Sequence, residues 1–305
     1  VGERVRGHPS REDRGEAAPL PAAGRPAENG PRAQAFLLHP PKAPSVPPMV
    51  HPLAVVHKEA RLGPEVRVEP FAVIEEGVEV GRGSTIRSHA VLRRGTVLGE
   101  RVLVDSGAVV GGDPNHLEFD PAVRSGVRVG DGVTLREHVT VHRSVEEGGA
   151  TMVDREAFLM THVHVGHDCR VGEQVIIAAH AGLSGHVEVE AGAFIGGMAG
   201  IHQFVRVGAG AMVGGLARIR ADVAPYTMVA EEDRLVGLNR VGLRRSGVDA
   251  AALSELRSLF REILGSPGSP HEKANGAPAP RSEEARRFLS FFVPNQRGYA
   301  RRIRT

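Results

Sequence analysis

The chain has 305 residues, 41% of them hydrophobic, and its charges nearly balance at a formal +2 with histidine neutral. The apolar content is enough for a substantial core, and the charge balance gives little reason to expect nucleic acid as a partner. The single cysteine excludes an internal disulfide framework and favours a reducing compartment. No apolar run approaches the roughly 20 residues that span a bilayer, and none has the form of a signal peptide. We therefore expect a cytoplasmic protein without an integral membrane segment.

The stretch 1–48 holds ten of the 21 prolines and shows no hydrophobic period. This composition is typical of disorder. The first methionine is Met49, directly before a regular pattern begins. We expect residues 1–48 to be a proline-rich tail, either a genuine flexible extension or the product of an upstream start codon that the native protein does not use.

A six-residue repeat begins at Val50. Aliphatic side chains recur at every sixth position up to Val110, and the period resumes at Val129 and runs to Ile219, broken only by Glu147. A spacing of six fits neither a helix, with 3.6 residues per turn, nor a lone strand, with a period of two. Three short strands per coil do explain it. The sequence therefore predicts an all-β left-handed parallel β-helix, a hexapeptide solenoid in which residue i lies beside residue i+18.

Glycine often follows the inward aliphatic residue, as at Gly63, Gly81 and Gly166. We expect it there because glycine permits a backbone with positive φ at each corner of a coil. Residues 111–128 and 143–151 break the period, so they are expected to project as loops from a β-helix domain that spans 49–222.

The period fades after Ile219, and residues 223–305 are expected to form a mainly helical C-terminal segment that caps the open end of the solenoid. The stretch "VDAAALSELRSLFREIL" has the apolar spacing of an amphipathic helix. A Gly/Pro-rich link from Gly265 to Pro280 follows. A further helix is expected in "SEEARRFLSFF", with Ser282 as its N-cap.

The stretch "HVHVGHDC" at residues 162–169 concentrates three histidines, an aspartate and the cysteine. Counted along the chain, it has the composition of a metal site. If Val165 points inward, however, His167 and Asp168 face outward and Cys169 takes a small inward position. We therefore expect the cysteine to pack in the core rather than bind a metal.

The register of 18 aligns six polar residues on one outer edge of consecutive coils: His164, His167, Asp168, His186, His202 and Gln203. A general base needs a partner that sets its tautomer, and Asp168 beside His167 can serve. Gly185 lies one coil above His167, where a glycine leaves a backbone N–H uncovered for an oxyanion. For any one of these residues, a solvated side chain or a plain turn is the alternative.

Five motifs on this solenoid resemble those of a known family: "LREHVTVHR", "HVHVGHDC", "LSGHVEV", "GGMAGIHQF" and "NRVGLRRSG". They are similar to UDP-N-acetylglucosamine O-acyltransferase, the first enzyme of lipid A biosynthesis, from about Met49 to the C-terminal "NQRGYARR". The resemblance implies transfer of a (R)-3-hydroxyacyl chain from the phosphopantetheine thioester of acyl carrier protein to the 3-hydroxyl of UDP-N-acetylglucosamine. It also implies a homotrimer with active sites between adjacent subunits, and neither a metal nor a separate cofactor.

By position in these motifs, the resemblance makes His167 the general base, Asp168 its support and the Gly185 N–H the oxyanion donor. It implies substrate contacts for His164, His186, His202, Gln203, Asn239 and Arg245, the last two on the nucleotide side. Gly215 falls where the family measures acyl-chain length. Because acyl carrier proteins are acidic, a set of arginines is expected to form the docking surface: Arg206, Arg218, Arg220, Arg240 and Arg244.

Four residues depart from the family pattern. Where the family usually shows "QDLK", this chain has "NHLE", with His116 and Glu118 in place of an acidic residue and a lysine. Val241 and Ser246 replace an acidic residue and an arginine near "NRVGLRRSG". A 3-amino sugar nucleotide therefore stays open as a second acceptor, and the sequence determines neither the acceptor nor the acyl-chain length.

A γ-type carbonic anhydrase is the alternative from another enzyme class, since it also uses a left-handed β-helix trimer with histidine ligands. His162 and His167 have the five-residue separation of such zinc sites. A third histidine two coils upstream is missing, since Gly126 occupies that position, and His142 would need help from the loop to replace it. A scaffold without enzymatic activity is the third interpretation, and it leaves the aligned histidine–aspartate strip without a purpose. His162 has no assigned role in the acyltransferase interpretation.

Overall fold

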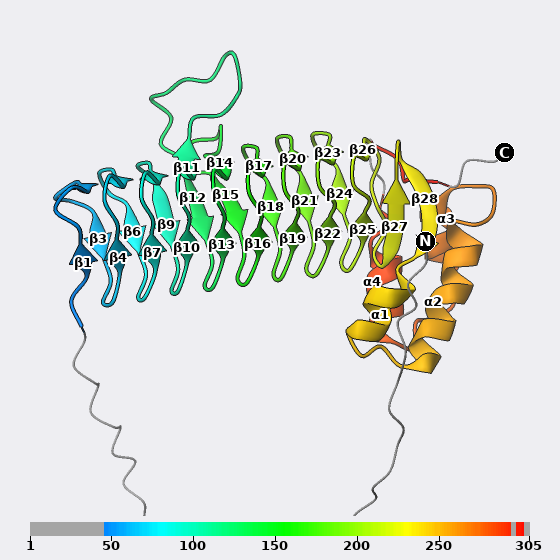
Figure 1. Cartoon of the computed structure of the whole chain (residues 1–305). Helices are drawn as coiled ribbons and strands as arrows, with labels where there is room; N and C mark the ends of the chain where they lie inside the picture. The colour runs from blue at the N-terminus through cyan, green and yellow to red at the C-terminus, as the bar shows by residue number, and fades with distance from the viewer. Residues whose placement is uncertain (1–45, 294–296, 302–305) are drawn as a thin grey trace, which may run out of the picture. The chain divides into compact units, whose positions relative to one another are not determined.

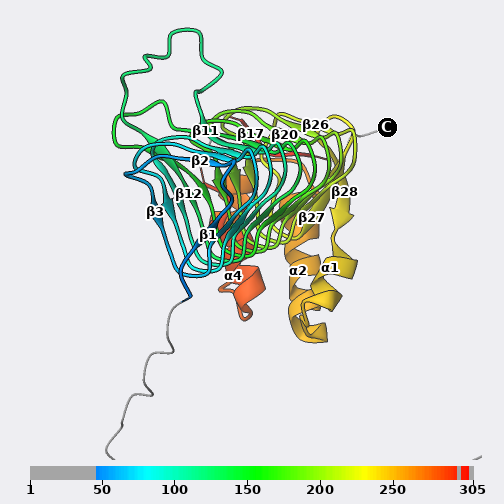
Figure 2. The same ribbon diagram turned by 60° about the vertical axis from the view of Figure 1, so that its left-hand side comes forward.

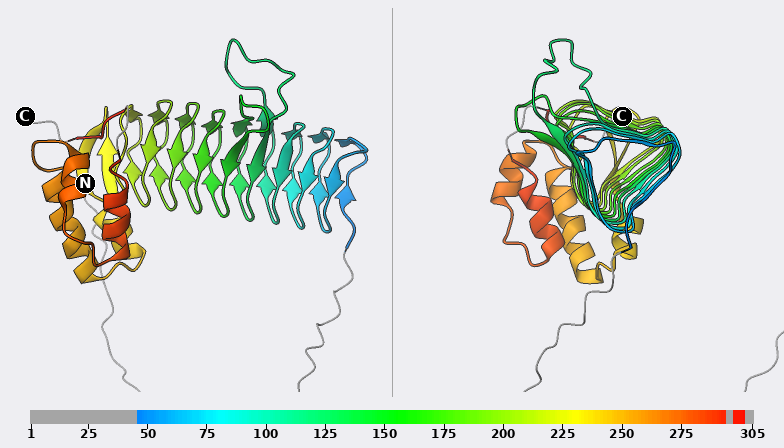
Figure 3. Two further views of the ribbon diagram at one scale, coloured as in Figure 1. Left: turned by 180° about the vertical axis from the view of Figure 1, so that it is seen from behind. Right: turned by 90° about the vertical axis from the view of Figure 1, so that its left-hand side faces the viewer.

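The computed structural model describes residues 46–293 and 297–301, which belong to one compact unit. The predicted tail lies, up to residue 45, outside the described residues. From residue 49 onward, very short strands follow one another as a stack of coils (Figure 1). Seen along the axis of the stack, the coils superimpose as a triangle (Figure 3). The predicted left-handed parallel β-helix is confirmed.

Each side of the triangle is one sheet. The first sheet contains β1 (Met49–Val50), β4 (Arg67–Val68), β7 (Thr85–Ile86), β10 (Leu103–Val104), β13 (Thr134–Leu135), β16 (Phe158–Leu159), β19 (Ile176–Ile177), β22 (Phe194–Ile195), β25 (Met212–Val213), β27 (Thr227–Ala230) and β28 (Arg234–Leu238). The second contains β2 (Val55–Val56), β5 (Val73–Ile74), β8 (Val91–Leu92), β11 (Val109–Gly112), β14 (Thr140–His142), β17 (His164–Val165), β20 (Gly182–Leu183), β23 (Gly200–Ile201) and β26 (Arg218–Ile219). The third contains β3 (Arg61–Leu62), β6 (Glu79–Val80), β9 (Thr96–Leu98), β12 (Gly126–Val129), β15 (Ala150–Val153), β18 (Arg170–Val171), β21 (Glu188–Val189) and β24 (Arg206–Val207).

The core is a column of aliphatic side chains in register. Val165 pairs with Leu183, and Leu183 with Ile201, so residue i lies beside residue i+18 here, as predicted. All three side chains are at most 1% exposed. Since each coil buries one aliphatic residue on each side of the triangle, the period of six is the direct consequence of burying apolar surface in a narrow prism.

The named glycines that follow the aliphatic residues, Gly63, Gly81 and Gly166, do not supply positive φ, so that expectation is wrong for them. Neither Gly81 nor Gly166 has a positive φ, whereas Asp168, the third residue after an aliphatic position, has φ 60°. A Cβ on Gly166 would lie 2.8 Å from the carbonyl oxygen of Leu183 in the next coil. These glycines are required because adjacent coils approach too closely for a side chain, and not because of their backbone angles.

Two loops leave the coils. Residues 113–125 connect β11 to β12 and project well beyond the triangle (Figures 1 and 2). Residues 143–149 connect β14 to β15 beside them. The Arg124 N–H and guanidinium donate to the Glu147 carboxylate, at 2.8 and 2.9 Å, which ties the two loops together.

The first sheet continues beyond the point where the hexad pattern ends. β27 pairs with β25 in parallel, and β28 pairs with β27 in the antiparallel direction. Val213 lies opposite Val229, so the register is i to i+16 rather than i to i+18. The hexad period is therefore lost while strand pairing goes on, and the segment expected to be mainly helical from residue 223 begins with strands.

Four helices follow, at the C-terminal end of the solenoid (Figure 1). They are α1 (Arg240–Arg245), α2 (Ala250–Ile263), α3 (Pro270–Gly276) and α4 (Glu283–Ser290). Ser282 caps α4 as predicted, accepting from the Ala285 N–H at 3.1 Å. The segment expected to be a Gly/Pro-rich link contains the helix α3, which starts at Pro270. Proline is tolerated there because the N–H groups of the first helical turn have no hydrogen-bond partner within the helix. None of the helices in the described ranges is long and apolar enough to cross a membrane.

Candidate active site

The stretch 162–169 crosses two corners of the triangle. β17 occupies the side between them, with Val165 fully buried, and the next corner carries His167 and Asp168. Cys169 is 0% exposed, and its thiol donates to the carbonyl oxygen of Ser184 at 2.9 Å. Burial raises the pKa of this thiol to about 12. The prediction that the cysteine packs inside the core is confirmed.

His167 and Asp168 form a hydrogen-bonded pair. The distance from His167 Nδ1 to Asp168 Oδ2 is 2.8 Å, and the two side chains are 15% and 12% exposed. Ser144 Oγ donates to Asp168 Oδ1, and the Val145 N–H donates to Oδ2 at 3.2 Å. The backbone N–H of Asp168 donates to Thr151 Oγ1 at 2.8 Å. Asp168 is therefore held from three sides, and it orients the imidazole in turn.

The carboxyl group of Asp168 is ionised at neutral pH. Burial is the strongest single influence and favours the protonated form, but hydrogen bonds from Ser144, His167 and Val145 together lower its pKa. An ionised carboxylate can only accept, so Nδ1 of His167 carries the shared hydrogen. In the neutral imidazole, Nε2 is then left with a lone pair that can accept a proton.

Gly185 lies directly against the imidazole of His167. A Cβ at this position would be 2.5 Å from both Cε1 and Nε2 of the ring. Only glycine leaves room for the histidine here. Within the described part of the chain, the Gly185 N–H donates no hydrogen bond, which suits the predicted oxyanion donor.

An aromatic stack continues from His167 along the corner. His186 lies edge-on to it, with ring centroids 5.1 Å apart, and stacks on Phe204 at 4.6 Å. His186 Nε2 is 3.9 Å from Asp168 Oδ2. His116 from the long loop also approaches His167 edge-on, with ring centroids 6.3 Å apart. Two imidazoles, those of His116 and His186, thus lie beside the candidate base.

Two neutral imidazoles lie on the adjoining face of the second sheet. His164 Nδ1 is 2.8 Å from Thr140 Oγ1, and the His164 ring contacts that of His142 edge-on at 4.8 Å. Burial, followed by the neighbouring His164, lowers the pKa of His142 to about 4. Burial also lowers the pKa of His164. Both rings are therefore neutral near pH 7 and can contact a ligand as hydrogen-bonding groups rather than as cations.

A cavity of about 530 Å³ joins these groups. Five of the predicted site residues line it: His164, His167, Gly185, His202 and Gln203. His142 and, from the long loop, Asn115 and His116 line it as well. Gly182 and Gly200 keep its floor open, because no atom lies within 4 Å of where their Cβ atoms would be. Four of the six residues of the predicted strip thus line one cavity, whereas Asp168 and His186 lie beside His167 without lining it. The individual roles of these residues stay predictions.

Sequence reasoning considered His142 only as a zinc ligand of the carbonic anhydrase alternative, and it missed Ser144. Both lie in "TVHRS", and strand pairing places Val141 opposite Val165, a register of i to i+24 because the loop at 143–149 adds six positions. The signal was present, since the hexad count resumes after that loop. Applying this longer register would have placed His142 near His164 and Ser144 near Asp168.

Three predicted residues lie elsewhere in the chain. Asn239 caps α1, accepting from the Gly242 N–H at 2.9 Å and donating to the carbonyl oxygen of Gly210 at 3.0 Å. Arg245 is in the last turn of the same helix. Gly215 lies at another corner, where a Cβ would be 3.3 Å from the carbonyl oxygen of Gly197. None of the three lines the cavity beside His167, so their roles stay predictions.

His162 belongs to a different corner from His167. Its ring lies between those of His138 and His180, with centroids 4.9 and 4.8 Å away, and the three form what we call the histidine ladder. Among the described residues, closely spaced metal-ligand groups reduce to one trio: His167, Asp168 and His186. His162 is not a member of this trio.

The arginines expected to dock an acidic protein fall into two kinds. Arg206 is engaged inside the molecule: it pairs with Asp222 at 2.7 Å and lies 4.4 Å above the Phe291 ring. It is not available for docking. Arg218 and Arg220 line the cavity; both pair with Glu232, and Arg220 also with Asp233, but their side chains stay 63% and 53% exposed. Arg240 and Arg244 lie on α1 and form no ion pair with any described residue.

Two models of transferase families match parts of the chain. Residues 48–94 match the family model of bacterial transferase hexapeptide repeats, and residues 222–300 match that of UDP-N-acetylglucosamine O-acyltransferase, domain 2. The fold and the site thus define a hexapeptide-repeat transferase with a histidine–aspartate pair.

Comparison with individual relatives identifies the family within this class. The acyl-[acyl-carrier-protein]–UDP-N-acetylglucosamine O-acyltransferase of Thermodesulfovibrio yellowstonii is 43% identical over 147 residues, 47% of this chain and 57% of that protein. The protein of the same name from Gloeothece citriformis is 40% identical over 106 residues, 34% of this chain and 38% of its own length. The solved UDP-N-acetylglucosamine acyltransferase from Campylobacter jejuni is 31% identical with a TM-score of 0.76, covering 83% of this chain and 99% of that one. The chain belongs to the UDP-N-acetylglucosamine O-acyltransferase family.

Proposed function

We propose that the protein transfers a (R)-3-hydroxyacyl chain from acyl carrier protein to the 3-hydroxyl of UDP-N-acetylglucosamine, the first step of lipid A biosynthesis. The observation that carries the proposal is the His167–Asp168 pair packed against Gly185 at one cavity. Membership of the acyltransferase family supports it. The sequence matches to the curated relatives cover 38% and 57% of their lengths.

His167 starts the reaction as general base. Its Nε2 takes the proton from the sugar 3-hydroxyl while the oxygen attacks the carbonyl carbon of the thioester. Asp168 fixes the tautomer and stabilises the imidazolium that forms. General-base catalysis of this kind typically contributes roughly 10²–10⁴-fold.

The tetrahedral intermediate then collapses. Its oxyanion accepts from the Gly185 N–H, the carbon–sulfur bond breaks, and the leaving thiolate takes the proton back from His167. The products are the 3-O-acyl sugar nucleotide and acyl carrier protein with a free thiol. A thioester is already activated, so these steps require no metal and no further cofactor.

Neighbouring groups would position the two substrates. His164 and His142, kept neutral by burial, together with His186, His202 and Gln203, are suited to hydroxyl groups of the acceptor and of the acyl chain. We assign the docking of acidic acyl carrier protein to four arginines: Arg218, Arg220, Arg240 and Arg244.

We further propose a homotrimer that functions in the cytoplasm. The outward row of the first sheet includes Phe158, Ile176, Phe194 and Met212, none of which is buried within one chain. Ile176 is 38% and Met212 37% exposed. An apolar face of this kind favours association. The neighbouring subunit would then supply Asn239, Arg245 and Gly215, which lie away from the cavity of their own chain.

The proposal is tested by assaying the purified protein with UDP-N-acetylglucosamine and a series of (R)-3-hydroxyacyl carrier proteins of different lengths. Ester formation with one or more lengths, abolished in His167→Ala, is the expected result. The 3-amino sugar nucleotide is the second acceptor to test, because His116 and Glu118 replace the residues usual in the long loop. Turnover with the amine alone would change the product to an amide, and turnover with neither acceptor would refute the proposal.

A further inference from the structure

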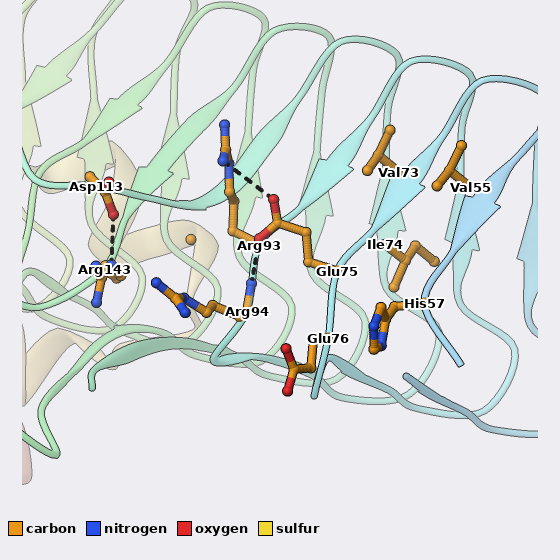
Figure 4. A pocket seen from close by; sticks show the side chains of 11 residues that line it. Val55, His57, Val73, Ile74, Glu75, Glu76, Arg93, Arg94, Asp113 and Arg143 are labelled. Atoms are coloured by element: carbon orange, nitrogen blue, oxygen red, sulfur yellow. Dashed lines mark hydrogen bonds and ion pairs between the residues drawn. The ribbon is translucent and has the colours of Figure 1, made fainter. Parts of the chain in front are cut away.

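Arg143 is a buried cation with an unusual number of partners. It directly follows β14 and is 4% exposed. Figure 4 shows its pair with Asp113 at the edge of a second cavity, on the N-terminal side of the long loop. A buried guanidinium is costly unless its N–H groups are satisfied. The hydrogen-bond partners of the guanidinium therefore indicate what this side chain stabilises.

The contacts of the Arg143 side chain follow the long loop from end to end. Its Nε donates to Asp113 at 2.8 Å, and the terminal nitrogens donate to the carbonyl oxygens of Pro121, at 3.1 Å, and of Val123. A further hydrogen bond reaches Ser125 Oγ at 3.3 Å. The guanidinium also lies 4.8 Å above the ring of Phe119. One side chain thus holds both ends and the middle of the segment 113–125.

The residues on either side of Arg143 belong to the candidate active site. His142 precedes it and contacts His164, while Ser144 follows it and donates to Asp168. The loop that Arg143 holds carries His116 to the edge of His167. Three consecutive residues thus connect the cavity, the loop and the carboxylate.

We propose that Arg143 is a positioning residue: its guanidinium clamps the long loop so that His116 closes the acceptor side of the cavity over His167. The inference rests on the proposed function, because it assigns this side of the cavity to the sugar nucleotide. A displacement of about 1 Å in a positioning element can cost about 10²-fold in rate. Lysine cannot replace the clamp, because an ammonium is a point charge with three donors and no planar fork.

The kinetic test uses Arg143→Lys and Arg143→Met, with Arg124→Met as the matched control. Arg124 also joins the two loops through Glu147, but its side chain is 90% exposed. In both Arg143 variants we expect the KM for the sugar nucleotide to rise at least tenfold, while the KM for acyl carrier protein changes less than twofold. A general loss of folded protein would instead lower kcat and leave both KM values unchanged.

Coupling between Arg143 and His116 is tested with the double variant His116→Ala/Arg143→Met. If Arg143 acts through the loop, the double variant is no more than about threefold worse in kcat/KM than the worse single variant. Effects that multiply would show that Arg143 acts independently of His116, and would overturn the proposal.

Hydrogen exchange of the amides in 113–125 supplies a readout that needs no turnover. We expect exchange to accelerate in both Arg143 variants and not in Arg124→Met. If Arg143→Met does not fold, Asp113→Ala removes a single contact, at a side chain that is 62% exposed, and must show a smaller effect of the same kind. Wild-type exchange rates, or an unchanged acceptor KM, in Arg143→Lys would refute the clamp. If the wild-type protein turns over no acceptor, the proposed function fails, and hydrogen exchange still decides whether Arg143 holds the loop.

Discussion

Two corners of the β-helix carry histidines in van der Waals contact, and they differ in whether a carboxylate accepts from an imidazole. The catalytic corner contains His167 and His186, 5.1 Å apart, and the histidine ladder contains His138, His162 and His180 at 4.8 to 4.9 Å. At the catalytic corner a carboxylate held by Ser144 and Val145 accepts from the imidazole. The ladder rings are exposed and, among the described residues, form no ion pair with a carboxylate.

The comparison shows that the number of histidines does not define the site. Each corner has a glycine that makes room for a ring, since a Cβ on Gly107 would lie 2.5 Å from His138 Nδ1, just as one on Gly185 would lie 2.5 Å from His167 Nε2. The catalytic corner adds the carboxylate of Asp168, which accepts from the imidazole, and an adjoining cavity. Both corners arise from the same hexad repeat, and the loop at 143–149 supplies the groups that hold Asp168.

The largest expected difference between the corners is the effect of removing one imidazole. His167→Ala should lower kcat by roughly 10²–10⁴-fold, because the proposed general base is lost. His162→Asn should stay within twofold of wild type, since asparagine tolerates the positive φ of 59° at that ladder position. Steady-state rates of ester formation measure both. An active His167→Ala protein would remove the base from the mechanism.

A methyl group at Gly185 tests the fit of the base. Gly185→Ala places a Cβ where the His167 ring now lies, 2.5 Å from Nε2, so the ring must leave Asp168. We expect kcat to fall about 10²-fold, with a thermal midpoint close to that of wild type. Gly237→Ala is the control, because no atom lies within 4 Å of where its Cβ would be on β28. Equal activity of the two variants would separate Gly185 from the chemistry.

Ser144→Ala removes the hydroxyl that donates to Asp168. Because that hydrogen bond lowers the pKa of the carboxyl group, the pKa of Asp168 rises in the variant. Activity should fall about tenfold, and the acidic limb of the pH profile of kcat/KM should move to higher pH. Ser88→Ala, which removes a 3.3 Å bond to Glu69 on the surface, should leave the profile in place. A shift toward lower pH would contradict the assigned role of the hydroxyl.

The smallest expected effect concerns stability in acid. The pKa of His142 is about 4 in the folded protein and about 6.5 when unfolded, so between these values the unfolded chain binds the extra proton. The free energy of unfolding should therefore decrease as the pH falls from 6.5 to 4, by about 1 kcal/mol from this group after solvent screening.

His142→Asn should reduce that loss. The measurement is urea unfolding at pH 7 and pH 5, at one protein concentration because the proposed trimer makes stability concentration-dependent. His180→Asn, which removes an exposed ladder histidine, should keep the wild-type difference between the two pH values. If the free energy of unfolding of His142→Asn decreases between pH 7 and pH 5 as much as that of the wild type, other groups cause the decrease.

Much of the fold was predictable because its cause is local. The aliphatic residue at every sixth position must be buried, and this alone predicts three strands per coil, the register of 18 and the inward thiol of Cys169. Helix α1 and the strands β27 and β28 escaped prediction because they follow no hexad. The prediction that the glycines after the aliphatic residues supply positive φ was wrong. Their actual cause, the close approach of neighbouring coils, cannot be recognised within a single repeat.

By itself, the sequence determined the solenoid and the outward placement of His167, Asp168 and Gly185 along one corner, because a strict period converts residue number into position. Only the tertiary structure decided which residues of the two inserted loops meet that corner. The hydrogen bond from Ser144 to Asp168 and the clamp of Arg143 on the long loop join residues across insertions. The path of an insertion depends on the buried polar groups that it must satisfy, and no repeat in the sequence encodes that path.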